Sequence, residues 1–305
     1  MFKTIESKAA TLRLAVSEVQ ESAQRFDELK MNQGIMLATL NQGKHSSNLK
    51  DYEFKVFSQW GEDGILQCLT SALEIPEKTF IEFGVEDFFE SNCRFLMMKD
   101  NWCGFVMDGS AANIARLRNS CFYWKYELSA VDAFITRENI NELLAKSGFG
   151  PDLGILSIDI DGNDYFVLEA IEAFSPRILI CEYNAVFGSS RQITIPYDAG
   201  FVRTEMHHSN LYYGASLGAI VSLANKKGYS LVGTNTAGNN AFFVRNDLMC
   251  SQFPALTAED GFTQSRFRES RAADGNLTYV SGDARLKLIQ GLPVVNVETG
   301  AIDEL

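Results

Sequence analysis

The stretch YSLVGTNTAGNNAFFVRND (229–247) contains two strand-like runs, YSLVGTN (229–235) and NAFFVRND (240–247), joined only by TAGN. This connection is too short for a crossover helix, so the spacing predicts an antiparallel hairpin. The apolar runs that precede it are nearly continuous, which is typical of parallel strands covered by helices on both faces. The sequence therefore predicts an α/β sheet that starts parallel and ends in an antiparallel strand at 240–247.

The segments before this hairpin alternate between strand-like and helix-like patterns. The expected strands are residues 79–86, 104–110, 122–131, 153–161 and 177–184. The expected helices are residues 91–101, 111–119, 136–146, 163–174 and, after a long loop, 215–227. Such alternation favours a Rossmann-like arrangement, in which helices cover both faces of the sheet.

The amino-terminal segment, residues 1–45, differs from the rest of the chain. It contains no proline, and its apolar residues recur in alternating steps of four and three. This spacing places them on one narrow helical stripe, which suits a coiled-coil seam. The stripe consists of Ile5, Ala9, Leu12, Val16, Val19, Ala23 and Phe26. We expect a helix that joins copies into a homo-oligomer, and a helix packed on its own domain is the alternative.

Composition limits the class of protein and its partners. The 305 residues carry a formal net charge of −12, and 46% of them are hydrophobic. A negative field repels phosphate backbones, so nucleic acid is not expected as a partner. The chain lacks a secretory signal, a membrane-spanning run and any C-x-x-C pair, which together favour a cytoplasmic protein with reduced thiols. We expect three parts: helical residues 1–45, an α/β domain over 52–250, and an extension, 251–305, packed on that domain.

Polar residues gather where the better strands end, whereas the amino ends of the strands carry nothing comparable. They are Glu82 and Gly84 after the first strand, Asp108, Gly109 and Ser110 after the second, Asp159 and Asp161 after the fourth, and Glu182 and Asn184 after the fifth. Ligands of open α/β sheets bind outside the carboxyl ends of the strands, so we expect one shared site. Several carboxylates on one rim are costly unless a cationic ligand or a divalent metal lies among them.

The first two strand ends bear on the kind of ligand. Gly84 lies where the strand turns, so a ligand can approach the backbone closely there. The further glycines of a dinucleotide fingerprint do not follow, and this disfavours NAD. Asp108 lies 24 residues after Gly84. That spacing suits a carboxylate that accepts hydrogen bonds from ribose hydroxyls, and a cap of the next helix is the alternative.

The later strand ends suggest acid–base or metal chemistry. Asp161, Glu182 and Asn184 offer oxygen donors, which suit Mg²⁺ or Mn²⁺ better than zinc. Asp159 or Asp161 could instead act as a general base, and the plainer interpretation of Asp159 is that backbone amides satisfy it. His207 lies in the long loop after the fifth strand and is a second candidate base, although exposed loop histidines are common.

Several motifs spread over the chain form a recognisable set. They are SQWGEDG (58–64), FIEFGVEDFFESNCRFL (80–96), GFVMDGS (104–110), LSIDIDGNDYFVLEA (156–170), ICEYNAVFG (180–188), YYGASLGAIVSLANKKGYSLVGTN (212–235) and NNAFFVRND (239–247). Taken together, these motifs resemble the FkbM-type methyltransferases, in particular a bacterial branch associated with glycan biosynthesis, and the resemblance covers about residues 52–250.

The resemblance implies a class I methyltransferase fold that uses S-adenosyl-L-methionine to methylate a hydroxyl of a sugar or surface glycan. Asp159 and Asp161 would then face the transferred methyl group. Asp161, Glu182 and Asn184 are also similar to the metal set of metal-dependent enzymes such as catechol O-methyltransferase. The implied cofactor-binding residues are Gln59, Glu82, Gly84, Asn92, Asp108, Gly109 and Ser110. The competing interpretations are an NAD-dependent oxidoreductase and a non-catalytic scaffold of a glycan-assembly complex.

Overall fold

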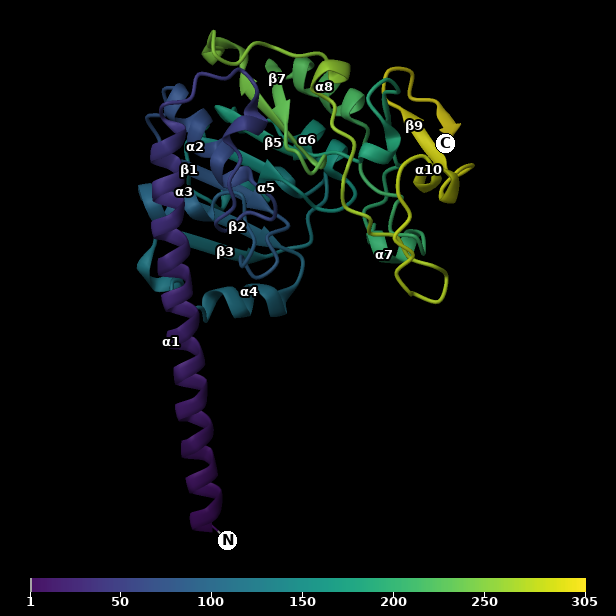
Figure 1. The fold of residues 1–305 in the computed structure, drawn as a ribbon. Helices are drawn as coiled ribbons and strands as arrows, with labels where there is room; N and C mark the ends of the chain where they lie inside the picture. Colours follow the sequence, from purple (N-terminus) through teal and green to yellow (C-terminus); the bar gives the residue numbers. More distant parts are fainter. Residues whose placement is uncertain (1) are drawn as a thin grey trace.

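A computed structural model describes the backbone of residues 2–305 and the side chains of Leu14, Glu18, Val19, Ser22 and 24–305. In this part of the chain, seven strands form one sheet in the order β3-β2-β1-β4-β5-β8-β7 (Figure 1). The strands are β1 (Thr79–Phe83), β2 (Cys103–Asp108), β3 (Leu128–Asp132), β4 (Ile155–Ile158), β5 (Ile178–Glu182), β7 (Tyr229–Thr234) and β8 (Asn240–Arg245).

The strand directions confirm the expected fold class. Strands β1 to β5 pair in parallel, whereas β8 runs antiparallel to both of its neighbours, β5 and β7. The short connection after β7 forms the predicted hairpin, and β8 inserts between β5 and β7. This order, with one reversed strand, is the Rossmann-like architecture of class I methyltransferases.

Helices cover both faces of the sheet because successive strand residues point to opposite sides. Phe80 belongs to the core under α2 and α3, whereas its neighbour Ile81 belongs to the core under α5, α6 and α8. The flanking helices are α2 (Glu62–Ala72), α3 (Arg94–Asp100), α4 (Ala111–Arg118), α5 (Ile140–Ala145), α6 (Asp164–Ala170) and α8 (Leu217–Lys226). No helix within the described residues combines the length and the apolar character needed to cross a membrane.

Two segments differ from the sequence expectation. The strand expected at 122–131 is wrong at its start, because η2 (Tyr123–Lys125) precedes β3 and sheet pairing begins only at Leu128. Phe122, Tyr123 and Tyr126 pack against the core on the α4 side instead of joining the sheet. Helix α2 lies in a region where no helix was predicted.

A second, three-stranded sheet, not predicted from the sequence, lies at the end of the molecule away from α1 (Figure 1). Its strands are β6 (Ile193–Thr194), β9 (Pro293–Asn296) and β10 (Ile302–Glu304). The first comes from the loop after β5 and the others from the carboxyl terminus, so the two segments share one small core. The remaining short elements are η1 (Leu49–Tyr52), η3 (Ala185–Phe187), α7 (Arg203–Met206), η4 (Asn246–Leu248), α9 (Ala258–Gly261) and α10 (Ala284–Leu288).

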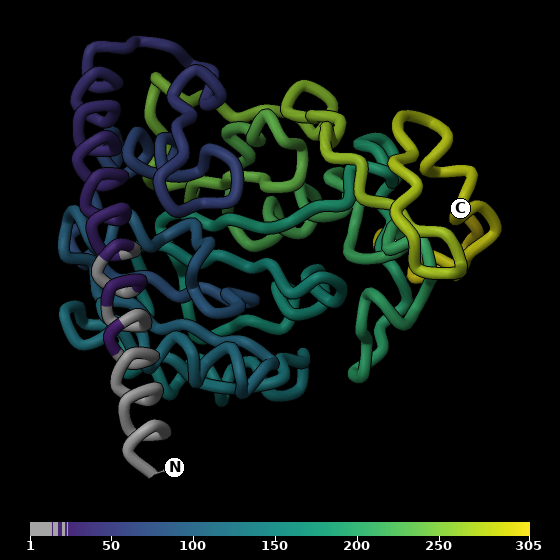
Figure 2. Tube along the Cα trace, turned by 60° about the horizontal axis from the view of Figure 1, so that its bottom comes forward, coloured from purple at the N-terminus to yellow at the C-terminus, as the bar shows by residue number. Residues whose placement is uncertain are grey.

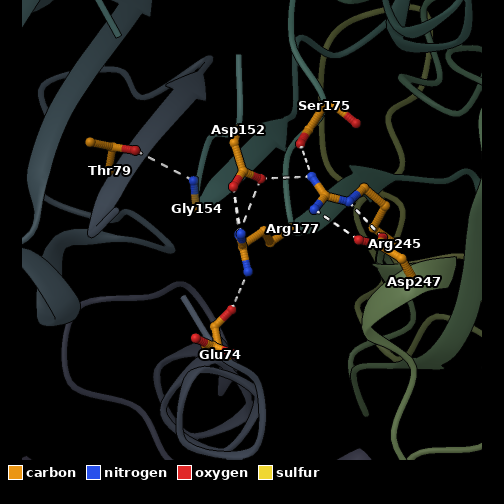
Figure 3. A network of polar contacts seen from close by, with 8 residues as sticks. All are labelled: Glu74, Thr79, Asp152, Gly154, Ser175, Arg177, Arg245 and Asp247. Atoms are coloured by element: carbon orange, nitrogen blue, oxygen red, sulfur yellow. Dashed lines mark hydrogen bonds and ion pairs between the residues drawn. The ribbon is translucent and has the colours of Figure 1, made fainter. Parts of the chain in front are cut away.

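The amino edge of the sheet is also polar, contrary to the sequence expectation. The Asp152 carboxylate accepts hydrogen bonds from both Arg177 and Arg245 (Figure 3). Arg177 also donates to the Glu74 carbonyl, and Arg245 pairs with Asp247. Because these charges satisfy one another, this edge holds strands together and does not call for a ligand.

Helix α1 (Phe2–Asn41) lies beside α2 and α3 on one side of the sheet (Figures 1 and 2). It approaches the body closely at Gly34, where a Cβ atom would lie 2.5 Å from Val56. The buried Arg94 ties the helix to the body through Asp27, at 2.7 Å. The Arg94 guanidinium also stacks between Phe57, at 4.1 Å, and Phe122, at 4.2 Å. Burying one charged group this fully requires its partner, so the contact fixes where α1 lies.

Part of the predicted stripe of α1 falls among residues whose side chains are described. Val19 is 68% exposed and Phe26 is 67% exposed. The side chains of Ile5, Ala9, Leu12, Val16 and Ala23 lie outside the described residues.

Replacing Arg94 by Ala is expected to lower the free energy of unfolding by about 3 kcal/mol, because a partly buried Asp27 loses its partner and two rings lose theirs. Chemical denaturation measures this loss. The matched control is Arg116→Ala, which removes an exposed Arg–Asp pair with Asp87 and is expected to change stability by under about 0.5 kcal/mol. Equal effects of the two substitutions would contradict the structural role of Arg94.

Candidate functional site

A cavity of about 550 Å³ opens at the carboxyl edge of the sheet. It brings Glu82, Asp108 and Asp159 together from the ends of β1, β2 and β4. The sequence-predicted residues that line it are Gln59, Glu82, Gly84, Asn92, Asp108, Gly109, Asp159, Asp161 and Glu182. Ser110, Asn184 and His207 are not part of this lining.

The floor of the cavity depends on Gly84. Its backbone has φ +68°, and a Cβ atom there would lie 1.6 Å from the carbonyl oxygen of Asp159. Only glycine permits both the left-handed conformation and this close approach. Two non-glycine residues of the lining, Glu86 and Asp161, also have positive φ, at 47° and 57°. Strained residues of this kind tend to cluster at functional sites.

Glu82 positions the loop that leads into α3. Its carboxylate accepts hydrogen bonds from the Ser91 hydroxyl at 2.6 Å, the Asn92 backbone N–H at 2.7 Å and the Cys93 backbone N–H at 3.2 Å. The Asn92 side chain in turn donates to Ser157 on β4 at 3.0 Å. Burial raises the pKa of Glu82, although these hydrogen bonds oppose the shift. Glu82 therefore acts on the cavity by holding Asn92 at its wall.

The sequence left two roles open at the end of β2, a ligand for ribose hydroxyls and a cap for the next helix. Asp108 and Ser110 are the residues concerned. The Ser110 hydroxyl caps α4 by accepting from the Asn113 backbone N–H at 3.3 Å. One Asp108 oxygen accepts from the Ser110 backbone, and the other accepts from the Glu86 N–H at 2.8 Å. The helix cap is thus Ser110, which is not part of the cavity lining, whereas Asp108 lines the cavity.

Three carboxylates converge at the ends of β4 and β5. Asp159, Asp161 and Glu182 each place an oxygen atom within 4.8 Å of the others. Burial, together with repulsion from Asp161 and Asp164, raises the pKa of Asp159 well above its usual value. Burial and the nearby Asp159 raise the pKa of Glu182 in the same way. Such a cluster favours a proton or a cation among its oxygens.

One cation in this cluster was missed by the sequence analysis. Arg203 of α7 pairs with Asp161 and lies 3.6 Å from Glu269. Its guanidinium also stacks on Tyr213, at 3.7 Å from the ring centre. Burial lowers the pKa of Arg203, but Tyr213 and the neighbouring carboxylates outweigh it, and the net shift is upward. The sequence signal for such a cation was the excess of carboxylates at the strand ends. Clustered carboxylates are costly unless a cation lies among them, and a loop that crosses the site can supply it.

Asn184 and His207 are not placed for the roles predicted for them. Asn184 is 1% exposed, and its amide donates to the carbonyls of Leu211 and Tyr213 and accepts from the Val186 N–H. These bonds hold the long loop, and Asn184 is not among the residues that line the cavity. The His207 ring contacts Ser209 at 2.7 Å instead of the cavity, and burial lowers its pKa.

Several buried polar atoms of the lining have no partner within the described residues. They are Asn163 Oδ1, Glu182 Oε2 and Asn240 Oδ1, on side chains 4%, 6% and 3% exposed. Buried oxygen atoms of this kind are nearly always hydrogen-bonded, so donors such as ordered water are expected beside them.

The carboxyl-terminal extension contributes to the cavity wall. Glu269 lines the cavity and accepts a hydrogen bond from Asn210 at 3.3 Å. Nearby, Phe267 stacks on Trp60, with ring centres 6.0 Å apart and planes inclined by 19°. Trp60 adjoins Gln59, so segments from both ends of the chain meet beside the cavity.

Comparison with known proteins bears on the fold of the chain and not on its function. No protein-family model and no curated protein sequence matches the chain. Among solved structures, the chain is similar to spermidine synthase from Thermotoga maritima, with 15% identity, a TM-score of 0.34, and coverage of 59% of this chain and 57% of that one. The match thus spans little more than half of the spermidine synthase.

Two further solved structures cover more of their own length. The N-terminal domain of EvdMO1 with SAH bound shows 8% identity and a TM-score of 0.37 over 70% of this chain and 93% of that one. An S-adenosylmethionine-dependent methyltransferase from Clostridium acetobutylicum shows 9% identity and a TM-score of 0.35, over 59% and 88%. At this level of similarity a shared fold does not imply a shared function, which depends on the residues of the site.

Replacing Gly84 by Ala is expected to destabilise the protein by more than about 1 kcal/mol, because the added Cβ atom meets a backbone oxygen at positive φ. The control is Gly109→Ala in the same cavity, where the new Cβ atom would meet only Phe134, at 3.4 Å. Thermal denaturation compares the two variants. If both melt like the unsubstituted protein, the close approach at Gly84 does not constrain the fold.

Proposed function

We propose that this protein is an S-adenosyl-L-methionine-dependent methyltransferase whose acceptor is a hydroxyl of a sugar or glycan. One observation carries the proposal: a single cavity at the carboxyl edge unites the bare backbone of Gly84 with the carboxylate of Asp108. This is the place where open α/β sheets bind their ligands. The spacing also suits an adenosyl group, with its ribose hydroxyls donating to Asp108.

The charge of the lining supports a cationic cofactor. Eight carboxylates and a single arginine are present among the described lining residues, which are Glu82, Glu86, Glu90, Asp108, Asp159, Asp161, Glu182, Glu269 and Arg203. A sulfonium ion is attracted to such a cavity, whereas a pyrophosphate is repelled. Beside Asp108, the apolar side chains of Phe134 and Ile135 offer a surface for a planar base.

The path of the chain after β1 argues against NAD. Dinucleotide sites place the pyrophosphate at the amino terminus of the helix that follows the first strand. Here α3 begins only at Arg94, and a loop occupies residues 85–93. S-adenosyl-L-methionine has no phosphate and needs no such helix end. The scaffold alternative is disfavoured as well, because clustered carboxylates are costly in a site that binds nothing.

The acceptor side of the cavity suits a molecule with several hydroxyl groups. The carboxylates that line the cavity accept hydrogen bonds, and hydroxyls donate them. Asp159 and Asp161 would face the transferred methyl group. The protein would align the acceptor oxygen with the methyl–sulfur bond and provide a carboxylate near its proton. Mass spectrometry of candidate glycans after incubation with enzyme and cofactor would identify the acceptor.

A divalent cation fits the same carboxylates and forms the second part of the proposal. Asp159, Asp161 and Glu182 are hard oxygen donors, close together, and Glu182 Oε2 has no partner within the described residues. Mg²⁺ and Mn²⁺ take such ligands, and a bound cation would lower the pKa of an acceptor hydroxyl. Arg203 pairs with one oxygen of Asp161, which leaves the other for a cation.

Replacing Asp108 by Ala is expected to weaken binding of S-adenosylhomocysteine at least tenfold, because the loss of hydrogen bonds to the ribose costs about 1.4 kcal/mol or more. Isothermal titration calorimetry measures this affinity. The control is Asp132→Ala, since Asp132 is the register partner of Asp108 on β3 and lies outside the cavity. Unchanged affinity in the Asp108 variant, or tighter binding of NAD than of S-adenosylhomocysteine, would exclude the cofactor assignment.

Replacing Asp161 by Asn is expected to weaken Mn²⁺ binding at least tenfold while S-adenosylhomocysteine still binds, because one charged ligand of the cation is lost. Titration with Mn²⁺ alone, followed by calorimetry or electron paramagnetic resonance, gives the affinity. Glu86→Gln is the matched control, since it removes a cavity charge outside the cluster. Failure of the unsubstituted protein to bind Mn²⁺ would refute the metal site and leave the cofactor proposal intact.

A further inference from the structure

Helix α1 has an apolar face that points away from the rest of the molecule. The large apolar side chains on this face are about two-thirds exposed. They are Val19 (68%), Phe26 (67%), Leu29 (65%), Met36 (67%) and Leu40 (70%). Contiguous exposed apolar surface on one side of a helix is a mark of an interaction site.

The spacing of this face is that of a coiled coil. Together with the exposed polar residues Ser22 and Gln33, these five apolar residues follow one another in alternating steps of three and four, which are the a and d positions of a heptad repeat. We call them the outer seam: Val19, Ser22, Phe26, Leu29, Gln33, Met36 and Leu40. The seam runs for about 33 Å at the rise of an α-helix. A strict seven-residue period over this length indicates a second helix that winds around the first.

The outer seam is separate from the face that packs on the body. The docked face consists of Asp27, Met31, Gly34, Ala38 and Asn41, which are buried or half-buried. These residues occupy the b and f positions of the same heptad, on the opposite side of the helix from a and d. Packing within one chain therefore does not account for the apolar outer seam.

We propose that the outer seam joins α1 to the α1 helix of a second copy, in a parallel two-stranded coiled coil. In a parallel homodimer each seam residue meets its own counterpart, so Gln33 at an a position faces Gln33 of the second copy. Each amide both donates and accepts, so the two side chains can hydrogen-bond to each other. A shifted register would place this amide against apolar side chains and leave it unpaired, at a cost in free energy.

The charged neighbours of the outer seam do not by themselves favour this alignment. Lys30 occupies an e position, and in a parallel pair it would lie near the like-charged Arg25, at a g position, of the second copy. The Lys30 ammonium, however, lies over rings of its own body, 5.8 Å from the centre of Phe57 and 5.4 Å from that of Phe89. The b and f positions face outward, so the two bodies would lie on opposite sides of the pair.

A membrane surface fits this face less well than a second helix. Helices that lie on membranes carry lysine and arginine along the polar flanks of the apolar face. The polar residues of α1 whose side chains are described include acids as well as bases, with Glu18, Asp27 and Glu28 beside Arg25 and Lys30. Such a mixture suits a helix in water next to another helix.

The test is the mass of the full-length protein in solution, by size-exclusion chromatography with light scattering. We expect twice the chain mass of 34.0 kDa for the unsubstituted protein. The double variant Phe26→Glu, Leu29→Glu is expected to have the mass of one chain, because four carboxylates would face one another in the seam. Its circular dichroism and its affinity for S-adenosylhomocysteine are expected to stay unchanged, since both residues lie on the face opposite the docked one.

The matched control is Leu14→Glu, which replaces an equally exposed apolar residue (65%) at a c position outside the outer seam and is expected to remain a dimer. A second variant, Gln33→Leu, is expected to stay dimeric at lower protein concentration, because an apolar side chain replaces a buried amide at an a position. A single-chain mass for the unsubstituted protein would overturn the proposal. So would a double variant that keeps twice the chain mass, or binding of anionic lipid vesicles by a monomer.

Discussion

The close approach of Gly84 to the carbonyl oxygen of Asp159 is the contact on which the functional architecture depends. It lets the chain turn after β1 at the level where β4 ends, with no side chain between the two backbones. The strand-end residues Glu82, Asp108 and Asp159 can then border one cavity. A larger residue at position 84 would push the two loops apart and divide that space, so one missing Cβ atom sets the geometry of the whole edge.

Charges are balanced at the amino edge of the sheet and unbalanced at the carboxyl edge. At the amino edge, Asp152 is shared by Arg177 and Arg245, and the charges balance within the protein. At the carboxyl edge, many carboxylates meet a single arginine, and three buried oxygens have no partner within the described residues. An unbalanced, unsatisfied edge is costly to fold, and a ligand that brings positive charge and hydrogen-bond donors offsets this cost. The imbalance is therefore the physical reason for placing the proposed ligand at this edge.

Helix α1 packs against the body with one face and exposes large apolar side chains on the opposite face. Small residues and the Asp27–Arg94 pair hold one face against the body, since Gly34 and Ala38 allow close packing. Large side chains at heptad positions occupy the other face and remain exposed. The helix thus links the folded body to a surface suited to self-association, and the docked face holds that surface in a defined direction. The sequence analysis placed a heptad stripe over residues 5–26, which shares only Val19 and Phe26 with the outer seam, and it could not tell which face the body covers.

Local spacing along the chain was enough to predict the hairpin at 229–247, the parallel strands and the edge at which their polar ends meet. These features follow from connection length and side-chain period, which depend on neighbouring residues. Tertiary structure alone decided that Ser110 and not Asp108 caps α4, that Asn184 binds the carbonyls of Leu211 and Tyr213, and that Arg203 and Glu269 enter the cavity. Such roles depend on which distant segment supplies each hydrogen-bond or ion-pair partner, and no local periodicity records that choice.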